Sequence, residues 1–523
     1  MKSKNTCMAV VDSDFTHNYT KMIGEIRGLV LSSQNVNTAL SLAKVYGDLR
    51  WLNHDGVYDD DGLELALFNS ILKVCKDELS QCEGALVENE TTRNMRTVLL
   101  ASKLYNQGGH TEVVIKWLNM MSDMFEHTLI VTDLIMNDIK DDIDRLGVRL
   151  VLCRELGVKA IKEILLAAVG SRYVIMHIHP NDIVAAMAAR LLRSIGCICV
   201  FYNHADHVFS YGIGAANVVC EISSFGEDIS RKSGRVRGDS FFLGVPLSRL
   251  NNECNHVAQS LNRQRKMILS CGAGYKYKPN GGAFFGEFVN EILSLRDDVV
   301  VVVVGSTGDE SWWKSWLING GNRWGGRVEF MGVLARPKYA ELLCSADIYV
   351  DSFPITGGTA FPEALISGKL CAAMESPIQG YSCADELRAA TVGELALQVN
   401  GLLHPNSPQF KKLERVRNKV ISIQSEDVFK SKILDIYNQN FFLVHNNNIT
   451  SKKHCTSWFE TNWVFEELIH LPQGQSISQV PFKWRVKIII LTLRVVSNCG
   501  LKDLARFMYK SFRLPTSWVS WVK

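Results

Sequence analysis

Short apolar runs alternate with amphipathic segments along most of the chain. The two clearest runs, Met267–Cys271 and Val299–Val304, are continuous and have the length of a buried strand. Strands that are covered on both faces read in this way, because neither face is polar. The other runs of strand length are Thr97–Ala101, His127–Val131, Arg149–Leu152, Tyr173–Ile178, Cys197–Tyr202, Asn217–Ile222, Val328–Met331, Ile348–Asp351 and Leu370–Met374. The pattern predicts parallel β-sheets.

Amphipathic helical patterns separate many of these runs, as in a doubly wound α/β fold. These patterns lie at Thr111–Met121, Glu155–Val169, Ile183–Ser194, Phe284–Leu295, Trp312–Ile318, Pro337–Cys344 and Ala360–Ser367. We therefore predict two Rossmann-like domains, at residues 94–245 and 246–440. A chain of 523 residues is long enough for both domains and for an extension at each end.

The predicted N-terminal extension, residues 1–93, carries long helical patterns at Met22–Lys44 and Leu63–Leu79. It also contains the acidic triplet Asp59-Asp60-Asp61. A calcium loop would need alternating oxygen ligands and a closing glutamate, and both are missing here. The triplet is therefore expected to lie in a solvated loop.

The predicted C-terminal extension, residues 441–523, is basic and contains tryptophan. Between Pro481 and Lys523 there are nine Lys and Arg residues and one acidic residue, Asp503, which gives a net charge of +8 (nine minus one). A basic amphipathic segment of this kind can lie on an anionic membrane surface. The alternative is a helix that packs back onto the protein and leaves its charges in water.

Composition narrows the classes of function. The net charge of +3 over the whole chain is too small to indicate nucleic-acid binding. No apolar run approaches the roughly 20 residues of a membrane span, and the first residues lack the apolar segment of a signal peptide. Fourteen cysteines without a Cys-x-x-Cys pair predict reduced thiols. The expected location is the cytoplasm, where the basic tail can rest on the inner face of the membrane if it does not pack onto the protein.

A glycine-rich turn joins the apolar run at Ile348–Asp351 to a helical pattern. It contains Gly357, Gly358 and Thr359, and Glu363 follows one helical turn later. Such a turn can present backbone N–H groups to an anion, and Thr359 can cap the helix. Glu363 can accept hydrogen bonds from ribose hydroxyls. The alternative is that the segment is only a turn.

The sequence from Asp351 to Leu370 resembles the donor-nucleotide signature of GT-B glycosyltransferases. The resemblance extends over Arg96–Asn440 and implies two Rossmann-like domains that face a cleft. It also implies that the second domain holds a nucleotide-diphosphate sugar and the first domain an acceptor. Lys276 and Lys278 follow the first strand of the second domain, where this superfamily commonly places a basic residue on the diphosphate. The alternative is that both lysines are only solvated.

Two groups of residues are candidates for the base. Gly108-Gly109-His110 resembles the turn of inverting GT-B enzymes in which a histidine deprotonates the acceptor. An imidazole suits this role because its usual pKa lies near neutrality. The second group, with His204 and Asp206, resembles a histidine-rich loop of bacterial cell-surface glycosyltransferases.

The second group also includes His177, His179 and His207, so a metal site is an alternative. The histidines do not have the i,i+4 spacing of a helical metal motif, and GT-B enzymes as a class need no bound metal. We therefore expect no metal and no cofactor apart from the sugar donor. Ile355 stands where many retaining GT-B families have a glutamate, which favours inversion.

The sequence thus predicts a glycosyltransferase that transfers a sugar from a nucleotide-diphosphate sugar to a glycan or lipid-linked acceptor, in surface polysaccharide synthesis. One alternative is another enzyme on the same scaffold, such as a nucleotide-sugar epimerase or a phosphorylase. A second alternative is a relative that has lost catalysis and acts as a binding partner. Gly357, Gly358 and Glu363 argue against this last possibility.

Overall fold

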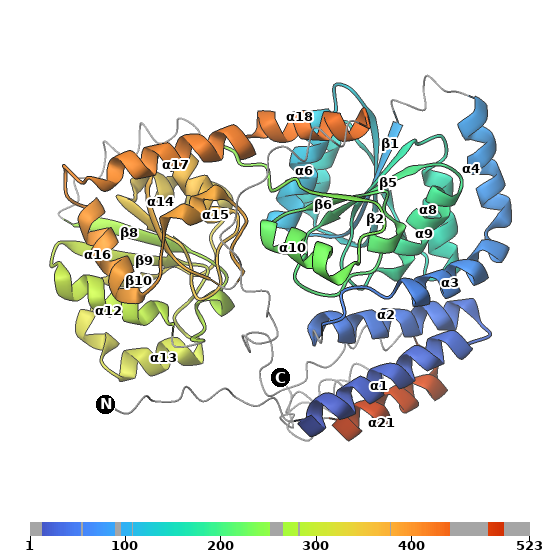
Figure 1. The fold of residues 1–523 in the computed structure, drawn as a ribbon, viewed down its shortest axis with the longest axis horizontal. Coiled ribbons are helices and arrows are strands. Elements are labelled where there is room, and N and C mark those ends of the chain that lie inside the picture. Colours follow the sequence, from blue (N-terminus) through green and yellow to red (C-terminus); the bar gives the residue numbers. More distant parts are fainter. Residues whose placement is uncertain are drawn as a thin grey trace.

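The computed structural model describes residues 13–53, 56–88, 96–106, 108–250, 265–280, 283–376, 378–439 and 480–495. Two α/β domains lie side by side, and a layer of helices covers the outer side of the first domain (Figure 1). The strands of the first sheet are β1 (Arg96–Leu104), β2 (Glu126–Ile135), β3 (Arg149–Leu152), β4 (Tyr173–His177), β5 (Ile198–Asn203), β6 (Val218–Glu221) and β7 (Asp239–Phe242). The strands of the second sheet are β8 (Lys266–Cys271), β9 (Val299–Val304), β10 (Val328–Phe330), β11 (Ile348–Val350), β12 (Leu370–Met374) and β13 (Arg388–Ala389).

Both sheets are parallel and have the strand order of a Rossmann-like domain. The order is β3-β2-β1-β4-β5-β6-β7 in the first sheet and β10-β9-β8-β11-β12-β13 in the second. The predicted doubly wound fold is therefore confirmed. Of the strands, the sequence pattern missed β7 and β13. Neither contains an apolar run of strand length, because β7 reads Asp-Ser-Phe-Phe and β13 has only two residues.

Helices cover both faces of each sheet. In the first domain they are α6 (Gly109–Met121), α7 (Asn137–Arg145), α8 (Val158–Ala167), α9 (Ile183–Ser194) and α10 (Ser224–Ser233). In the second they are α12 (Phe285–Leu295), α13 (Ser311–Ile318), α14 (Arg336–Ser345), α15 (Ala360–Ile366) and α16 (Val392–Leu402). Successive side chains of β1 point to opposite faces of the sheet. Leu99 therefore packs in the apolar cluster under α6, whereas Val98 and Leu100 pack in the cluster under α8 and α9.

Two consecutive helices connect the domains. The helix α17 (Gln409–Gln424) lies on the second domain, and α18 (Glu426–Tyr437) crosses back over α6 of the first (Figure 1). The indole of Trp117 donates a hydrogen bond to the Tyr437 hydroxyl over 3.2 Å, and both side chains are buried. Residues 426–437, predicted to belong to the second domain, thus pack on the first. The apolar core is continuous from α6 into the second domain.

The N-terminal extension forms α1 (Ser13–Ser32), α2 (Val36–Leu52), α3 (Asp61–Val74) and α4 (Lys76–Glu88). Each of the two long helices that the sequence suggested is therefore broken. The first break lies between α1 and α2. Asn35 starts the new helix there, because its side chain accepts a hydrogen bond from the backbone N–H of Thr38 and caps α2. The break after α3 falls at Cys75, which is completely buried.

The prediction of a solvated loop at Asp59–Asp61 is wrong. Asp60 caps α3 and pairs with Arg27 of α1 at 2.7 Å. Asp59 pairs with Arg237 at 3.0 Å, and Asp61 pairs with Arg190 of α9 at 2.5 Å. Asp59 and Asp61 therefore fix the N-terminal helices to the first domain, and Asp60 joins α1 to the start of α3.

The described part of the C-terminal extension is a helix, α21 (Phe482–Val495), which packs beside α1 (Figure 1). Ile488 and Leu491 are buried against the N-terminal helices. Residues 441–479 and 496–523 of this extension lie outside the described residues. Within the described part of the chain, no helix is both long and apolar enough to cross a membrane.

The cysteines agree only in part with the expectation of reduced thiols. Within the described ranges, nine cysteines have free thiols, and they are Cys75, Cys82, Cys153, Cys197, Cys199, Cys220, Cys271, Cys371 and Cys383. Cys344 is disulfide-bonded, so the expectation is wrong at that position.

The contact between α3 and α9 generates a stability prediction. Arg190 donates to the Glu64 carboxylate over 3.2 Å, and Glu64 is completely buried. Burial raises the pKa of Glu64 to about 7, against the opposing effect of Arg190. We expect Arg190→Met to lower the free energy of unfolding by about 3–5 kcal/mol at pH 8, because it leaves a buried carboxylate without its cation.

The loss should be smaller at pH 5. A carboxyl group whose pKa is higher in the folded state than in the unfolded state loses stabilising effect as the pH rises. Denaturant unfolding at the two pH values measures this difference. Arg145→Met is the control, since Arg145 is exposed and contacts only neighbours on its own helix, Asp141 and Asp142, among the described residues. Equal stability of the two variants at pH 8 would contradict the conclusion that Arg190 stabilises the buried Glu64 carboxylate.

Candidate functional site

A cleft of about 720 Å³ lies between the two domains, at the carboxyl ends of their strands. The second domain contributes the loops that follow β8 and β11. These two strands are neighbours in the sheet, and their connections leave in opposite directions. Ligands bind to open parallel sheets at such a switch point, because diverging loops leave a crevice there. The volume is in the range of small-molecule sites.

The loop after β11 is held in shape by a buried carboxylate. Asp351 is completely buried and accepts a hydrogen bond from the Gly357 backbone N–H over 2.9 Å and from the Thr356 hydroxyl over 2.6 Å. Arg388 completes the group at 3.0 Å from Asp351. A Cβ atom on Gly357 would lie 2.7 Å from the Asp351 carboxylate, so only glycine fits here. The backbone N–H of Gly357 therefore binds the Asp351 carboxylate and does not point to a ligand.

The two predicted glycine turns face each other across the cleft. Gly108 and Gly109 line it from the first domain, and Gly358 and Thr359 from the second. A Cβ atom on Gly109 would lie 3.5 Å from the Thr359 hydroxyl. Thr359 precedes α15, but its side chain makes no capping hydrogen bond, so the expectation of a cap is wrong. The hydroxyl points instead toward the opposite turn.

Of the two predicted lysines, Lys276 lines the cleft and Lys278 does not. The Lys276 ammonium donates to the Thr356 carbonyl over 2.9 Å, which places it beside the Gly357–Thr359 loop. Burial lowers the pKa of Lys276, and the nearby Asp351 carboxylate opposes this change. Lys278 is exposed.

Glu363 lines the cleft and is only 2% exposed. Its carboxylate lies 3.2 Å from Arg336 of α14 and 3.8 Å from Lys116 of α6, in the other domain. Burial raises the pKa of Glu363, and these two cations oppose the effect. Both cations also contact Glu112 at 3.5 Å. Sequence reasoning missed Lys116, which lies in the other domain, and Arg336, which lies on another helix of the same domain. No sequence spacing relates these charges to Glu363.

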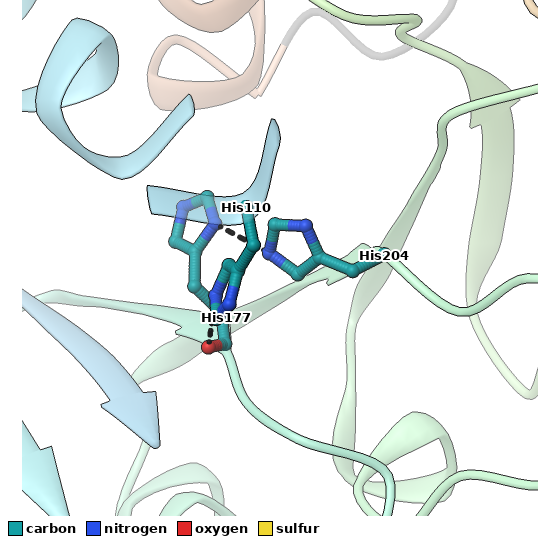
Figure 2. A group of neighbouring side chains, drawn as sticks. All are labelled: His110, His177 and His204. Carbon is teal, nitrogen blue, oxygen red and sulfur yellow. Dashed lines mark hydrogen bonds between the residues drawn. The ribbon is translucent and has the colours of Figure 1, made fainter. Parts of the chain in front are cut away.

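The structure brings together three histidines at the carboxyl ends of the central strands of the first sheet (Figure 2). His110 lies at the start of α6, His177 ends β4 and His204 follows β5. The rings of His110 and His204 have centroids 4.0 Å apart, and His177 Nδ1 lies 3.0 Å from His204 Nε2. Burial lowers the pKa of His110 to about 4 and the pKa of both other rings well below the usual value. All three imidazoles are therefore neutral at pH 7.

The other members of the histidine-rich group separate. His207 lines the cleft, and its Nδ1 lies 3.3 Å from the Asp206 carboxylate. Asp206 is completely buried and also accepts a hydrogen bond from the Ser223 hydroxyl. His179 instead contacts Trp51 of α2, with ring centroids 4.4 Å apart. The histidine that lines the cleft is thus His207, which the sequence placed only in the wider group.

The fold is found among solved structures, although the sequence has no close match. No family model and no curated protein matches the chain. The structure of HepE from Anabaena in complex with UDP superposes with a TM-score of 0.51 and 14% identity, over 66% of this chain and 100% of that chain. A glycosyltransferase from Rickettsia africae superposes with a TM-score of 0.50 and 13% identity, over 66% of this chain and 98% of that chain.

At such low identity the superposition shows the fold alone. These neighbours are GT-B proteins, and the chain has the GT-B fold, with two Rossmann-like domains that face a cleft. The resemblance that the sequence suggested is therefore confirmed at the level of architecture. The helices before β1 and the chain after α18 are additions to the two sheets.

Proposed function

We propose that the protein is a glycosyltransferase that moves a sugar from a nucleotide-diphosphate sugar to an acceptor hydroxyl. One observation carries this proposal. Lys276, Glu363 and the Gly357–Thr359 loop meet in one cleft at the switch point of the second sheet, opposite the first domain. The UDP in the HepE complex supports a nucleotide donor.

The donor contacts follow from the chemistry of these groups. The Lys276 ammonium has three donors and uses one on the Thr356 carbonyl, so it can also bind a diphosphate. Its charge stabilises the diphosphate as it leaves, a task that does not require a metal ion. The Glu363 carboxylate can accept hydrogen bonds from ribose hydroxyls while Arg336 and Lys116 keep it oriented.

Substitution of Glu363 tests the donor site. Glu363→Ala should weaken UDP binding by about 1–3 kcal/mol, the range for a lost hydrogen bond to a charged group. The fold should hold, since Lys116 keeps its contacts with Glu112 and Glu426. Titration calorimetry with UDP measures the effect. Glu341→Ala is the control, because this glutamate pairs only with Lys338 on the surface of α14. Unchanged UDP affinity would remove Glu363 from the site.

We assign the acceptor base to His207, with Asp206 as the group that orients its ring. The base takes the proton of the acceptor hydroxyl while the acceptor oxygen bonds to the sugar carbon and the bond to the diphosphate breaks. His207 lines the cleft, whereas His110 and His204 contact each other. Ile355 also lines the cleft and provides no carboxylate for a retaining reaction, so inversion is favoured.

The base assignment predicts a separation of turnover from binding. His207→Ala should reduce turnover by about 10²–10⁴-fold and leave UDP affinity nearly unchanged, because the residue acts on the acceptor. Hydrolysis or transfer of a UDP-sugar in a coupled assay measures turnover. His110→Ala and His204→Ala are the comparison variants. If only these two variants lose turnover, the base is in the group first predicted from the sequence.

We further propose a lipid-linked or surface-glycan acceptor, which the protein reaches by resting on the inner face of the membrane. The described part of the basic extension supports this. On α21, Lys483 and Lys487 are exposed and flank Trp484, and Phe482 is 66% exposed. A buried side of α21 packs on α1, so the opposite side can meet a membrane without unfolding.

Charge reversal tests this membrane contact. Lys483→Glu with Lys487→Glu should reduce co-sedimentation with anionic liposomes, since each cation near the surface contributes about 1 kcal/mol. Binding of the unchanged protein should fall at high salt, where the Debye length shrinks to about 3 Å. Lys314→Glu with Lys338→Glu changes the net charge equally on the exposed surface of the second domain. Equal sedimentation of the two double variants would exclude α21 as the contact.

A further inference from the structure

Three separate segments bring His110, His177 and His204 to one point (Figure 2). One ring nitrogen of each histidine lies within 4.8 Å of the other two. Across the described ranges, no other group of three histidine, cysteine or acidic side chains has this geometry. The segments follow or end β1, β4 and β5, which are neighbours at the centre of the first sheet.

The hydrogen bonds of the cluster are incomplete. His177 is completely buried, and its Nε2 has no hydrogen-bond partner. Buried polar atoms without a partner are rare, so the packing around this ring leaves one polar contact unmade. His177 Nδ1 and His204 Nε2 lie 3.0 Å apart, at hydrogen-bond distance, and the tautomer decides which of them carries the proton. A cation bound by both nitrogens would replace this hydrogen bond.

The geometry fits a zinc ion. Bonds of about 2.0–2.1 Å in a tetrahedral site place two nitrogens about 3.3 Å apart. The shortest pair here is at 3.0 Å and all three nitrogens lie within 4.8 Å, so small ring movements suffice. His110 Nε2 lies 2.9 Å from the His177 carbonyl oxygen. A ligating histidine usually has such a partner on its second nitrogen, which leaves Nδ1 of His110 for the metal.

We propose that His110, His177 and His204 bind one zinc ion. Three histidines are a ligand set that zinc accepts, and such sets leave a fourth position for water. The ion would join the start of α6 to the ends of β4 and β5, directly beside the Gly108–Gly109 turn of the cleft. The proposal does not depend on the reaction, since it concerns the first domain and not the donor loops.

Metal binding to the full-length protein tests the proposal. After dialysis against a chelator, the protein should bind one more equivalent of Zn²⁺ than the His110→Gln/His204→Gln double variant, measured by titration calorimetry and elemental analysis. Comparison with the double variant corrects for Zn²⁺ bound by histidines elsewhere in the chain. Both side chains are only partly buried, so the variant is expected to fold. Co²⁺ in place of Zn²⁺ should give the visible absorption of a four-coordinate ion.

A matched variant checks specificity. His404→Gln removes an exposed histidine of the second domain and should keep the full equivalent. Zn²⁺ should also raise the melting temperature of the unchanged protein and of His404→Gln, but not of the double variant, because a ligand of the folded state raises apparent stability. Equal stoichiometry in the unchanged protein and the double variant would overturn the proposal. Circular dichroism confirms that each variant is folded.

Discussion

The position of every group in the cleft depends on the apolar core that the two domains share. This core runs from the α6 side of the first sheet, beneath α18, into the second domain. Trp117 and Tyr437 are buried where α18 lies on α6, and a hydrogen bond fixes their relative position. Because α17 and α18 are consecutive, the second sheet cannot turn away without exposing these aromatic side chains. The carboxyl ends of both sheets therefore face each other.

Buried ion pairs also hold the groups of the cleft in position. Asp351 and Arg388 pair inside the second domain and set the shape of the loop after β11. Glu363 is instead paired with Lys116 across the cleft and with Arg336 on its own side. A buried carboxylate that loses its cation is costly. The first domain therefore helps to keep a carboxylate of the second domain ionised, and the two halves of the cleft are electrostatically coupled.

The N-terminal helices extend the first domain. Their acidic triplet binds Arg27, Arg190 and Arg237, and α21 packs on α1 from the far end of the chain. In Figure 1, α1, α2 and α21 lie below the first domain, and α4 lies on its side away from the second domain. They leave the cleft open and give the protein a second surface, on which α21 exposes Phe482, Lys483 and Lys487.

The sequence by itself determined the two parallel sheets, because central strands covered on both faces need unbroken apolar runs such as Val299–Val304. It also located the glycine turns, because glycines between a strand and a helix indicate a close backbone approach. In the structure, Gly357 leaves room for the Asp351 carboxylate. It did not determine which distant side chains meet. The Glu363–Lys116 pair joins two domains, and His110, His177 and His204 come from three strand ends with no common spacing. Only the packing of the sheets and of α18 brings such groups within a few ångströms, because contacts between distant segments depend on the whole core.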